Sequence, residues 1–159
     1  MAVWRVILTL SATLLPTSEI VGVDASGFNR SHASKHYTKR AEVTIQQLKV
    51  TLLVNTKVNA ILNLHTTATR KHDSQIAPSL INRNPENIDI PLGNKGYDDQ
   101  KIRRPARHHE IRLLIKYREF TSLHKTWNVR LDPDLYGQRS QSETVNSTLN
   151  RKYGAFVRS

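Results

Sequence analysis

VTIQQLKVTLLVNTKVNAILNLHTTA, residues 43–68, is the stretch that decides the fold. It holds two runs, 43–54 and 60–68, that are rich in β-branched and apolar residues and are separated by the polar segment NTKVN. Two such runs joined by a short polar segment predict an antiparallel hairpin. Upstream, the apolar run IVGVD at residues 20–24 is followed by ASG, which predicts a buried strand that enters a turn after Asp24.

Downstream of the hairpin, helical and strand patterns alternate. Residues 72–83 predict a helix with Asp73 or Ser74 as its N-cap and with Pro78 near the first turn, where proline costs least. We then expect a short strand before the turn LGNKG, a proline-interrupted helix over 99–110, a buried strand over 111–117, an irregular linker over 118–133 and a helix from Leu135 onward. A three-strand meander followed by alternating helices and strands predicts an α/β fold, a mixed sheet with helices on its faces.

Composition points to the kind of partner rather than to a reaction. The 159 residues are enough for one domain with a core, and 24 Lys and Arg against 13 Asp and Glu give a net charge of +11. This charge favours a polyanion, nucleic acid ahead of an anionic membrane, and does not separate an enzyme from a binding module. The absence of cysteine excludes disulfides and thiol chemistry and favours a cytoplasmic protein.

The opening segment MAVWRVILTLSATLLPTSE imitates a signal peptide, because Arg5 precedes an apolar run that reaches Leu15. Three hydroxyl residues interrupt the run, and it is shorter than the ~20 residues that cross a bilayer. We therefore expect a short helix that ends at Pro16 and no membrane partner, with a small secreted protein as an alternative.

Three polar positions lie at the edges of the expected elements: Asp24 and Asn94 after strands, and Glu143 on the last helix. Catalytic groups tend to lie where loops leave a rigid scaffold. Phosphoryl transfer by two cations needs clustered carboxylates, because Mg²⁺ or Mn²⁺ must bridge the attacking and leaving oxygens. An amide such as that of Asn94 is a poorer ligand.

Six segments resemble the core of DDE-type insertion-sequence transposases: DASGF, HYTKR, TIQQLKVTLLV, RKHDSQIAPSLI, GNKGYDDQKI and YGQRSQSETVNS. The resemblance implies a ribonuclease-H-like fold with acidic ligands on the first strand, after the fourth strand and on a late helix. It implies DNA phosphodiester hydrolysis and strand transfer in transposition, with a pair of Mg²⁺ or Mn²⁺ ions as cofactors. The implied partners are transposon-end and target DNA, with a homodimer left open.

Carried onto this chain, the resemblance places the first metal ligand at Asp24 and the third at Glu143. The second falls on Asn94, where the family has the Asp of a D-K-G-Y motif. At an effective dielectric near 20, one charge pair ~4 Å apart is worth about 4 kcal/mol, so the loss weakens metal binding by about a thousandfold. We expect impaired activity unless Asp98 or Asp99 substitutes, which their offset past the turn disfavours.

The resemblance also covers a Tyr, Arg, Glu, Lys signature on the last helix, matched by Tyr136, Arg139 and Glu143, while Asn150 stands where the family has Lys. It implies that Tyr136 and Arg139 support Glu143 and that the fourth place contacts phosphate. The expected DNA-binding residues are Lys35, Lys39, Arg40, Lys95, Asn150 and Lys152. A merely solubilising basic surface is the alternative for the lysines and arginines.

Few residues precede Asp24 or follow Glu143, whereas the family carries an end-recognition region upstream and more helices downstream. We therefore expect residues 1–17 to be a helical remnant and residues 18–159 to be a catalytic core that is incomplete at both ends. The alternative function is a non-catalytic, basic DNA-binding remnant that competes with a full-length enzyme for DNA.

Overall fold

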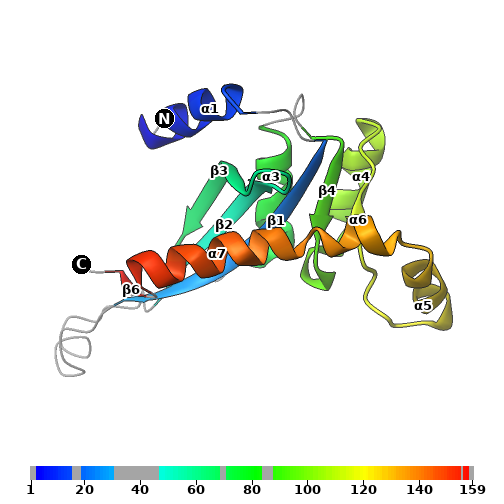
Figure 1. The fold of residues 1–159 in the computed structure, drawn as a ribbon. Coiled ribbons are helices and arrows are strands. Elements are labelled where there is room, and N and C mark those ends of the chain that lie inside the picture. Colours follow the sequence, from blue (N-terminus) through cyan, green and yellow to red (C-terminus); the bar gives the residue numbers. More distant parts are fainter. Residues whose placement is uncertain are drawn as a thin grey trace, which may run out of the picture.

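The computed structural model describes residues 3–15, 19–30, 47–68, 71–83, 88–154 and 156–157. In these residues a mixed sheet carries helices on both faces (Figure 1). The strands are β1 (Ile20–Arg30), β2 (Gln47–Asn55), β3 (Ala60–Thr67), β4 (Ile90–Gly93), β5 (Leu114–Ile115) and β6 (Phe156–Val157). The helices are α1 (Val3–Thr13), α3 (Asp73–Ile81), the 3₁₀ turn η2 (Lys95–Tyr97), α4 (Gln100–His108), α5 (Ser122–Val129), α6 (Pro133–Gly137) and α7 (Ser140–Tyr153).

The strand order is β3-β2-β1-β4-β5, and β6 pairs with the far end of β1. The first three strands form an antiparallel meander, and β4 and β5 then run parallel to β1. Parallel neighbours need a crossover, which α3 and α4 supply. The predicted hairpin and the predicted mixed α/β sheet are therefore confirmed.

Two apolar layers hold the helices to the sheet, because successive strand residues point to opposite faces. On one face, Val21 and Val23 of β1 join a buried cluster with Ala77 and Ile81 of α3. On the other face, Leu52 and Val54 of β2 bury against Val145 of α7. In Figure 1, α7 crosses the front of the sheet and α3 lies behind it.

Gly22 of β1 is the point where α7 comes closest to the sheet. A Cβ at Gly22 would lie 2.9 Å from Cβ and 3.0 Å from Oγ of Ser142 on α7. Gly22→Ala is therefore expected to lower the free energy of unfolding by about 1–3 kcal/mol, because overpacking displaces the helix. Urea denaturation measures this. Gly137→Ala is the control, since a Cβ there meets nothing within 4 Å; an equal loss in both variants would contradict the close approach.

The turn expected after Asp24 is wrong, because β1 continues to Arg30. Ala25, Ser26 and Gly27 pair with Thr51, Val50 and Lys49 of β2. The polar side chains of this stretch do not mark a strand end. They face a helix instead of an apolar layer.

Several expected element bounds also need correction. The linker over 118–133 contains α5, whose N-cap Thr121 accepts a hydrogen bond from the backbone N–H of His124. Of the strand expected over 111–117, only Leu114 and Ile115 form β5. The helix expected from Leu135 is two helices, because α6 ends at Gly137 and α7 begins at Ser140.

Both prolines expected at helix starts or breaks lie inside continuous helices. Pro78 lies inside α3, whose N-cap is His72 and not Asp73 or Ser74; the His72 Nδ1 accepts from the backbone N–H of Ser74. Pro105 lies inside α4 without ending it. Packing of these helices against each other and the sheet overrides the local cost of proline.

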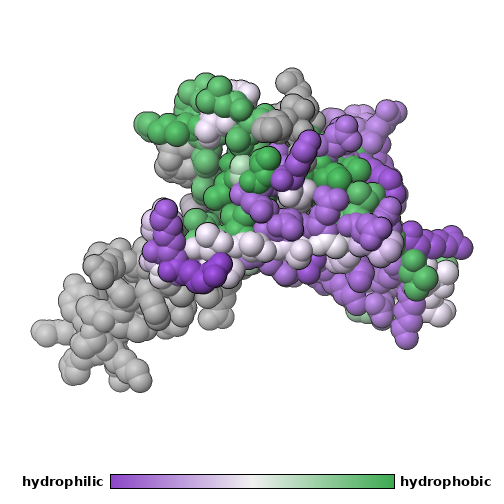
Figure 2. Space-filling model, viewed as in Figure 1, coloured by the Kyte–Doolittle hydropathy of each residue, from purple (hydrophilic) through white to green (hydrophobic). Residues whose placement is uncertain are grey.

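The N-terminal helix α1 packs along β3, and Ala12 reaches the core. Val3, Val6, Ile7 and Leu10 of α1 are exposed, and Figure 2 shows a hydrophobic surface at this helix, above a polar α7. Within the part of the chain that the structure describes, no helix combines the length and apolar character needed to cross a membrane.

Candidate active site

The candidate site lies where β1 crosses under α7. Gly22, Asp24 and Ser26 alternate along β1 and so share the face that α7 covers. Opposite them, side chains spaced by four residues on α7 form a polar stripe: Ser142, Asn146 and Asn150. The Asn146 Nδ2 donates to Oδ2 of Asp24 at 2.8 Å, and the Asn150 Nδ2 donates to Oγ of Ser26 at 3.4 Å.

Asp24 is a half-buried carboxylate whose pKa is affected by burial, hydrogen bonds and two neighbouring charges. Burial raises its pKa above the ordinary value, while hydrogen bonds from the Asn146 side chain and the Ala25 backbone lower it. The Glu143 carboxylate raises the same pKa, and the Arg139 guanidinium lowers it. Asp24 and Glu143 are therefore near enough to repel each other, which a bound cation would relieve.

Glu143 is held by the residue one helical turn before it. Arg139 forms an ion pair with Glu143, whose side chain keeps 51% of its exposure. The ring of Tyr136, on α6, lies 5.9 Å from Cζ of Arg139, and Nζ of Lys116 lies 4.7 Å from the same ring. The three signature residues thus form one chain of contacts, although Tyr136 is not on the helix of Glu143.

Asn94 follows β4 in line with Asp24. Gly22 pairs with Leu92 in the parallel register, so continuing both strands by two residues aligns Asp24 with Asn94. Asn94 is extended, with φ −76° and ψ 176°. Its Oδ1 accepts from the backbone N–H of Gly96 at 2.7 Å and so caps η2. The amide oxygen is committed to the turn, which is the role that turn chemistry favours for Asn.

Asp98 does not replace the missing carboxylate, because it is part of a structural network. One oxygen accepts from Nε of Arg103 at 2.9 Å, and the other accepts from the backbone N–H of Arg118 at 2.8 Å. Asp99 caps α4 instead, and the backbone N–H of Lys101 lowers its pKa.

Arg103 is buried despite its charge. Its Nη2 donates to the carbonyl of Ile115 at 3.1 Å, and its guanidinium lies 3.7 Å from the ring centroid of Tyr117. Arg118 reaches back to the turn, donating from Nε to the carbonyl of Lys95 at 3.1 Å. This network fixes the segment that follows Asn94.

Sequence reasoning missed Asn146, the residue in direct contact with Asp24. The signal was present in part: polar residues alternate along β1 and recur every four residues along α7. What the sequence could not supply was the pairing of these two stripes, which lie more than 100 residues apart in the chain.

The expected DNA-binding residues differ in where they lie and in what they contact. Lys35, Lys39 and Arg40 lie outside the described residues. Lys95 pairs with Glu119 at 2.6 Å, and that hydrogen bond lowers the pKa of Glu119. Lys152 is exposed, with Nζ 5.5 Å from the ring centroid of Tyr153. Asn150 turns to Ser26 on β1.

The residues present fit a divalent cation only in part. Among the described residues, no three His, Cys, Asp or Glu side chains gather closely enough to hold a metal ion. Asp24 and Glu143 carry carboxylate oxygens, and Asn146, which donates to Asp24, has a buried Oδ1 without a hydrogen-bond partner. Hard oxygens of this kind suit Mg²⁺ or Mn²⁺.

The sequence model of the transposase DDE domain family matches residues 15–158, so the chain belongs to this family. This confirms the resemblance found in the motif segments. Among curated proteins, none matches the chain.

Solved structures with similar chains include the simian T-cell lymphotropic virus intasome in complex with a PP2A regulatory subunit, at TM-score 0.44 and 12% identity, covering 89% of this chain and 47% of that one. The Mos1 mariner paired end complex with Mn has TM-score 0.39 and 10% identity, covering 96% of this chain and 61% of that one. The Mos1 paired-end complex with left transposon end has TM-score 0.37 and 10% identity, covering 96% and 60%. This chain thus spans less than two thirds of the length of each of them.

Proposed function

We propose that the chain is the DNA-processing domain of a transposase, built for phosphodiester hydrolysis and strand transfer, and that this copy is impaired. The observation that carries the proposal is the hydrogen bond from Asn146 of α7 to Asp24, because it brings the half-buried carboxylate of the central strand under the helix that carries Glu143. Asn94 comes two residues after Leu92, which pairs with Gly22, just as Asp24 comes two residues after Gly22. Asp24, Asn94 and Glu143 are the three positions at which the family resemblance puts acidic ligands.

In this proposal Asp24 and Glu143 hold a divalent cation, Mg²⁺ or Mn²⁺. A bound cation would polarise the scissile phosphodiester and neutralise developing charge. Arg139 fixes the Glu143 carboxylate through its ion pair, and Tyr136 lies against Arg139. A second cation would depend on residue 94, where the neutral amide is tied to Gly96. Strand cleavage by a pair of cations is therefore weakened.

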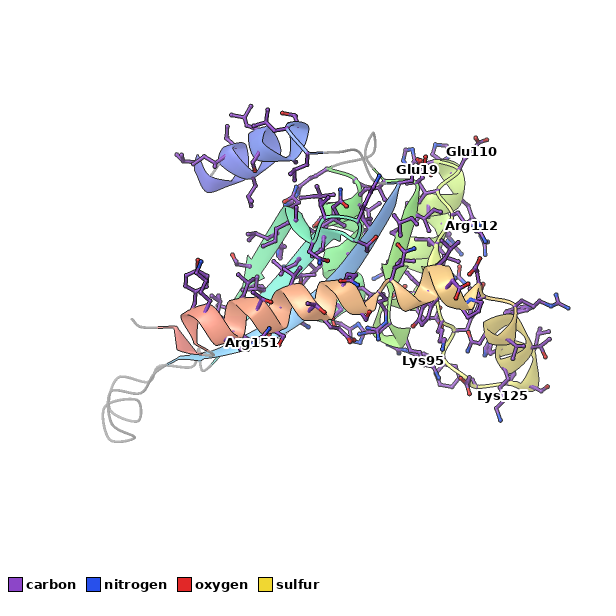
Figure 3. The ribbon with its side chains drawn as sticks, in the orientation of Figure 1. Glu19, Lys95, Glu110, Arg112, Lys125 and Arg151 are labelled. Atoms are coloured by element: carbon purple, nitrogen blue, oxygen red, sulfur yellow. The ribbon has the colours of Figure 1, made fainter. Side chains whose placement is uncertain are left out.

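DNA binding follows from charge more than from any one contact. The net charge of +11 favours phosphate. Figure 3 labels three basic residues along the lower edge of the coloured ribbon: Lys95 in η2, Lys125 on α5 and Arg151 on α7. We propose that DNA lies along this edge, with transposon ends and target DNA as partners. We also propose a cytoplasmic location and leave open a homodimer that would pair two ends.

The second candidate function is a DNA-binding remnant without cleavage activity. It is favoured by one observation, the hydrogen bond that commits the Asn94 oxygen to the turn. A mobility-shift assay together with a nicking assay separates the two functions.

We expect the chain to bind duplex DNA with an affinity that falls steeply with salt, because each neutralised phosphate releases a counterion. We expect little or no Mn²⁺-dependent nicking. Nicking that Asp24→Ala abolishes would show an active enzyme and overturn the impairment. Failure to bind DNA even at low salt would overturn both candidate functions.

A further inference from the structure

Asn146 contacts Asp24, and Asn94 is the residue that follows β4; their amide oxygens differ in what they bind. The Oδ1 of Asn94 accepts from the backbone N–H of Gly96. The Oδ1 of Asn146 is buried and has no hydrogen-bond partner, although its Nδ2 donates to Asp24 at 2.8 Å. Asn146 itself is only 5% exposed, so water does not freely satisfy that oxygen. The amide oxygen without a hydrogen bond is therefore that of Asn146 on α7, and not that of Asn94 in the turn after β4.

An amide presents a donor and an acceptor on the same carbon, so a half-turn about the last side-chain bond exchanges them. Without a cation, the donor faces the Asp24 carboxylate and satisfies it. With a cation beside Asp24, the preferred neighbour is an oxygen lone pair, because hard divalent cations take carboxylate and amide oxygens as ligands. The same rotation would cost Asn94 its bond to Gly96.

We propose that Asn146 is a third oxygen ligand of the cation site, joining Asp24 and Glu143 and taking part of the role that the residue at 94 has lost. This proposal rests on the proposed function, since it concerns the same cation. It places the site at the junction of β1 and α7, where Ser142 and Gly22 allow the helix to approach closely.

Asn150 is the matched control, one turn further along the same face of α7. Its Nδ2 also contacts β1 and its Oδ1 is also without a partner, but it bonds Ser26 and not a carboxylate. Removing the Asn150 amide changes a polar contact of the same kind. If the polar stripe had a purely structural role, removing the amide at position 146 or at position 150 would have the same effect on Mn²⁺ affinity.

The test measures Mn²⁺ binding to the full chain without DNA. Calorimetry and the electron paramagnetic resonance signal of free Mn²⁺ give the affinity. Asn146→Ala is expected to weaken binding by about 10- to 100-fold, the usual effect of removing a group that contacts or orients a ligand. Asn146→Asp is expected to tighten binding by at least about tenfold, because it returns a negative charge to the site. Asn150→Ala is expected to leave the affinity unchanged, and Asn150→Asp is expected to raise it by less than Asn146→Asp does, because its charge lies one helical turn further from Asp24.

Far-UV circular dichroism and thermal melts report whether each variant folds, and Asn146→Ser replaces Asn146→Ala if the latter does not. If Mn²⁺ binding to the native sequence is too weak to measure, the same pairs are compared in the Asn94→Asp background. Equal affinities for the Asn146 and Asn150 variants would overturn the inference. If Asp24→Ala abolishes binding while Asn146→Ala does not change it, only the inference fails; if Asp24→Ala has no effect, the proposed cation site fails with it.

Discussion

Asn94→Asp is expected to tighten Mn²⁺ binding by on the order of a thousandfold and to give the chain metal-dependent nicking activity. The added charge is worth about 4 kcal/mol against a cation ~4 Å away at an effective dielectric near 20. The turn should tolerate the change, because one carboxylate oxygen can accept from the Gly96 N–H as Oδ1 of Asn94 does. The other oxygen is then free of the turn and available to a cation. Calorimetry measures the affinity, and a supercoiled plasmid measures nicking.

Asn82→Asp is the control for charge. It adds the same carboxylate at an exposed position at the other end of α3 from the His72 cap. The control should leave both Mn²⁺ affinity and nicking as they are in the native sequence. A gain of the same size in both variants would mean that net charge, not the position of residue 94, governs cation binding.

Arg103→Ala is expected to lower the free energy of unfolding by about 3–5 kcal/mol, the usual loss when one partner of a buried ion pair is removed. The side chain of Arg103 is 7% exposed and that of its partner Asp98 is 16% exposed. Removing the guanidinium also leaves the carbonyl of Ile115 without this donor and uncovers the ring of Tyr117. Chemical denaturation with urea gives the difference directly.

The neighbouring residue provides a matched comparison. Arg104 carries the same charge on the same helix but is exposed, and Arg104→Ala should change the stability by no more than about 0.5 kcal/mol. If both variants lost the same stability, the network around Asp98 would not hold the segment after Asn94 in place.

The order of the central strands could be predicted from the sequence because it depends on local patterns. The runs at 43–54 and 60–68 are apolar and β-branched, and the polar residues between them mark the hairpin. The motif segments indicated the family, and the match over residues 15–158 confirms it. Those segments also supplied Asp24 and Glu143, and the structure places the two within electrostatic reach of each other.

The residues whose roles were not predicted have one thing in common. Each of these roles depends on a contact with a residue that is distant in the sequence. Ser26 indicates a turn when taken alone, yet it lies in a strand that pairs with Val50 of β2, and Asn150 of α7 contacts its hydroxyl. Arg103 is typical of a surface, yet it is buried because Asp98 and the Ile115 carbonyl satisfy it. Asn146 carries no local signal of its own, and only its contact with Asp24 gives it a role.

The central claim is that one cation site lies at the junction of β1, α7 and the turn after β4. Paramagnetic broadening of ¹⁵N-labelled chain by substoichiometric Mn²⁺, in the native sequence and in Asn94→Asp, tests this most directly. The account predicts that the amide signals nearest Asp24, residue 94 and Glu143 broaden first, and that Asp24→Ala removes the effect. Broadening centred elsewhere, for example at His108 and His109, or broadening that survives Asp24→Ala, would contradict it.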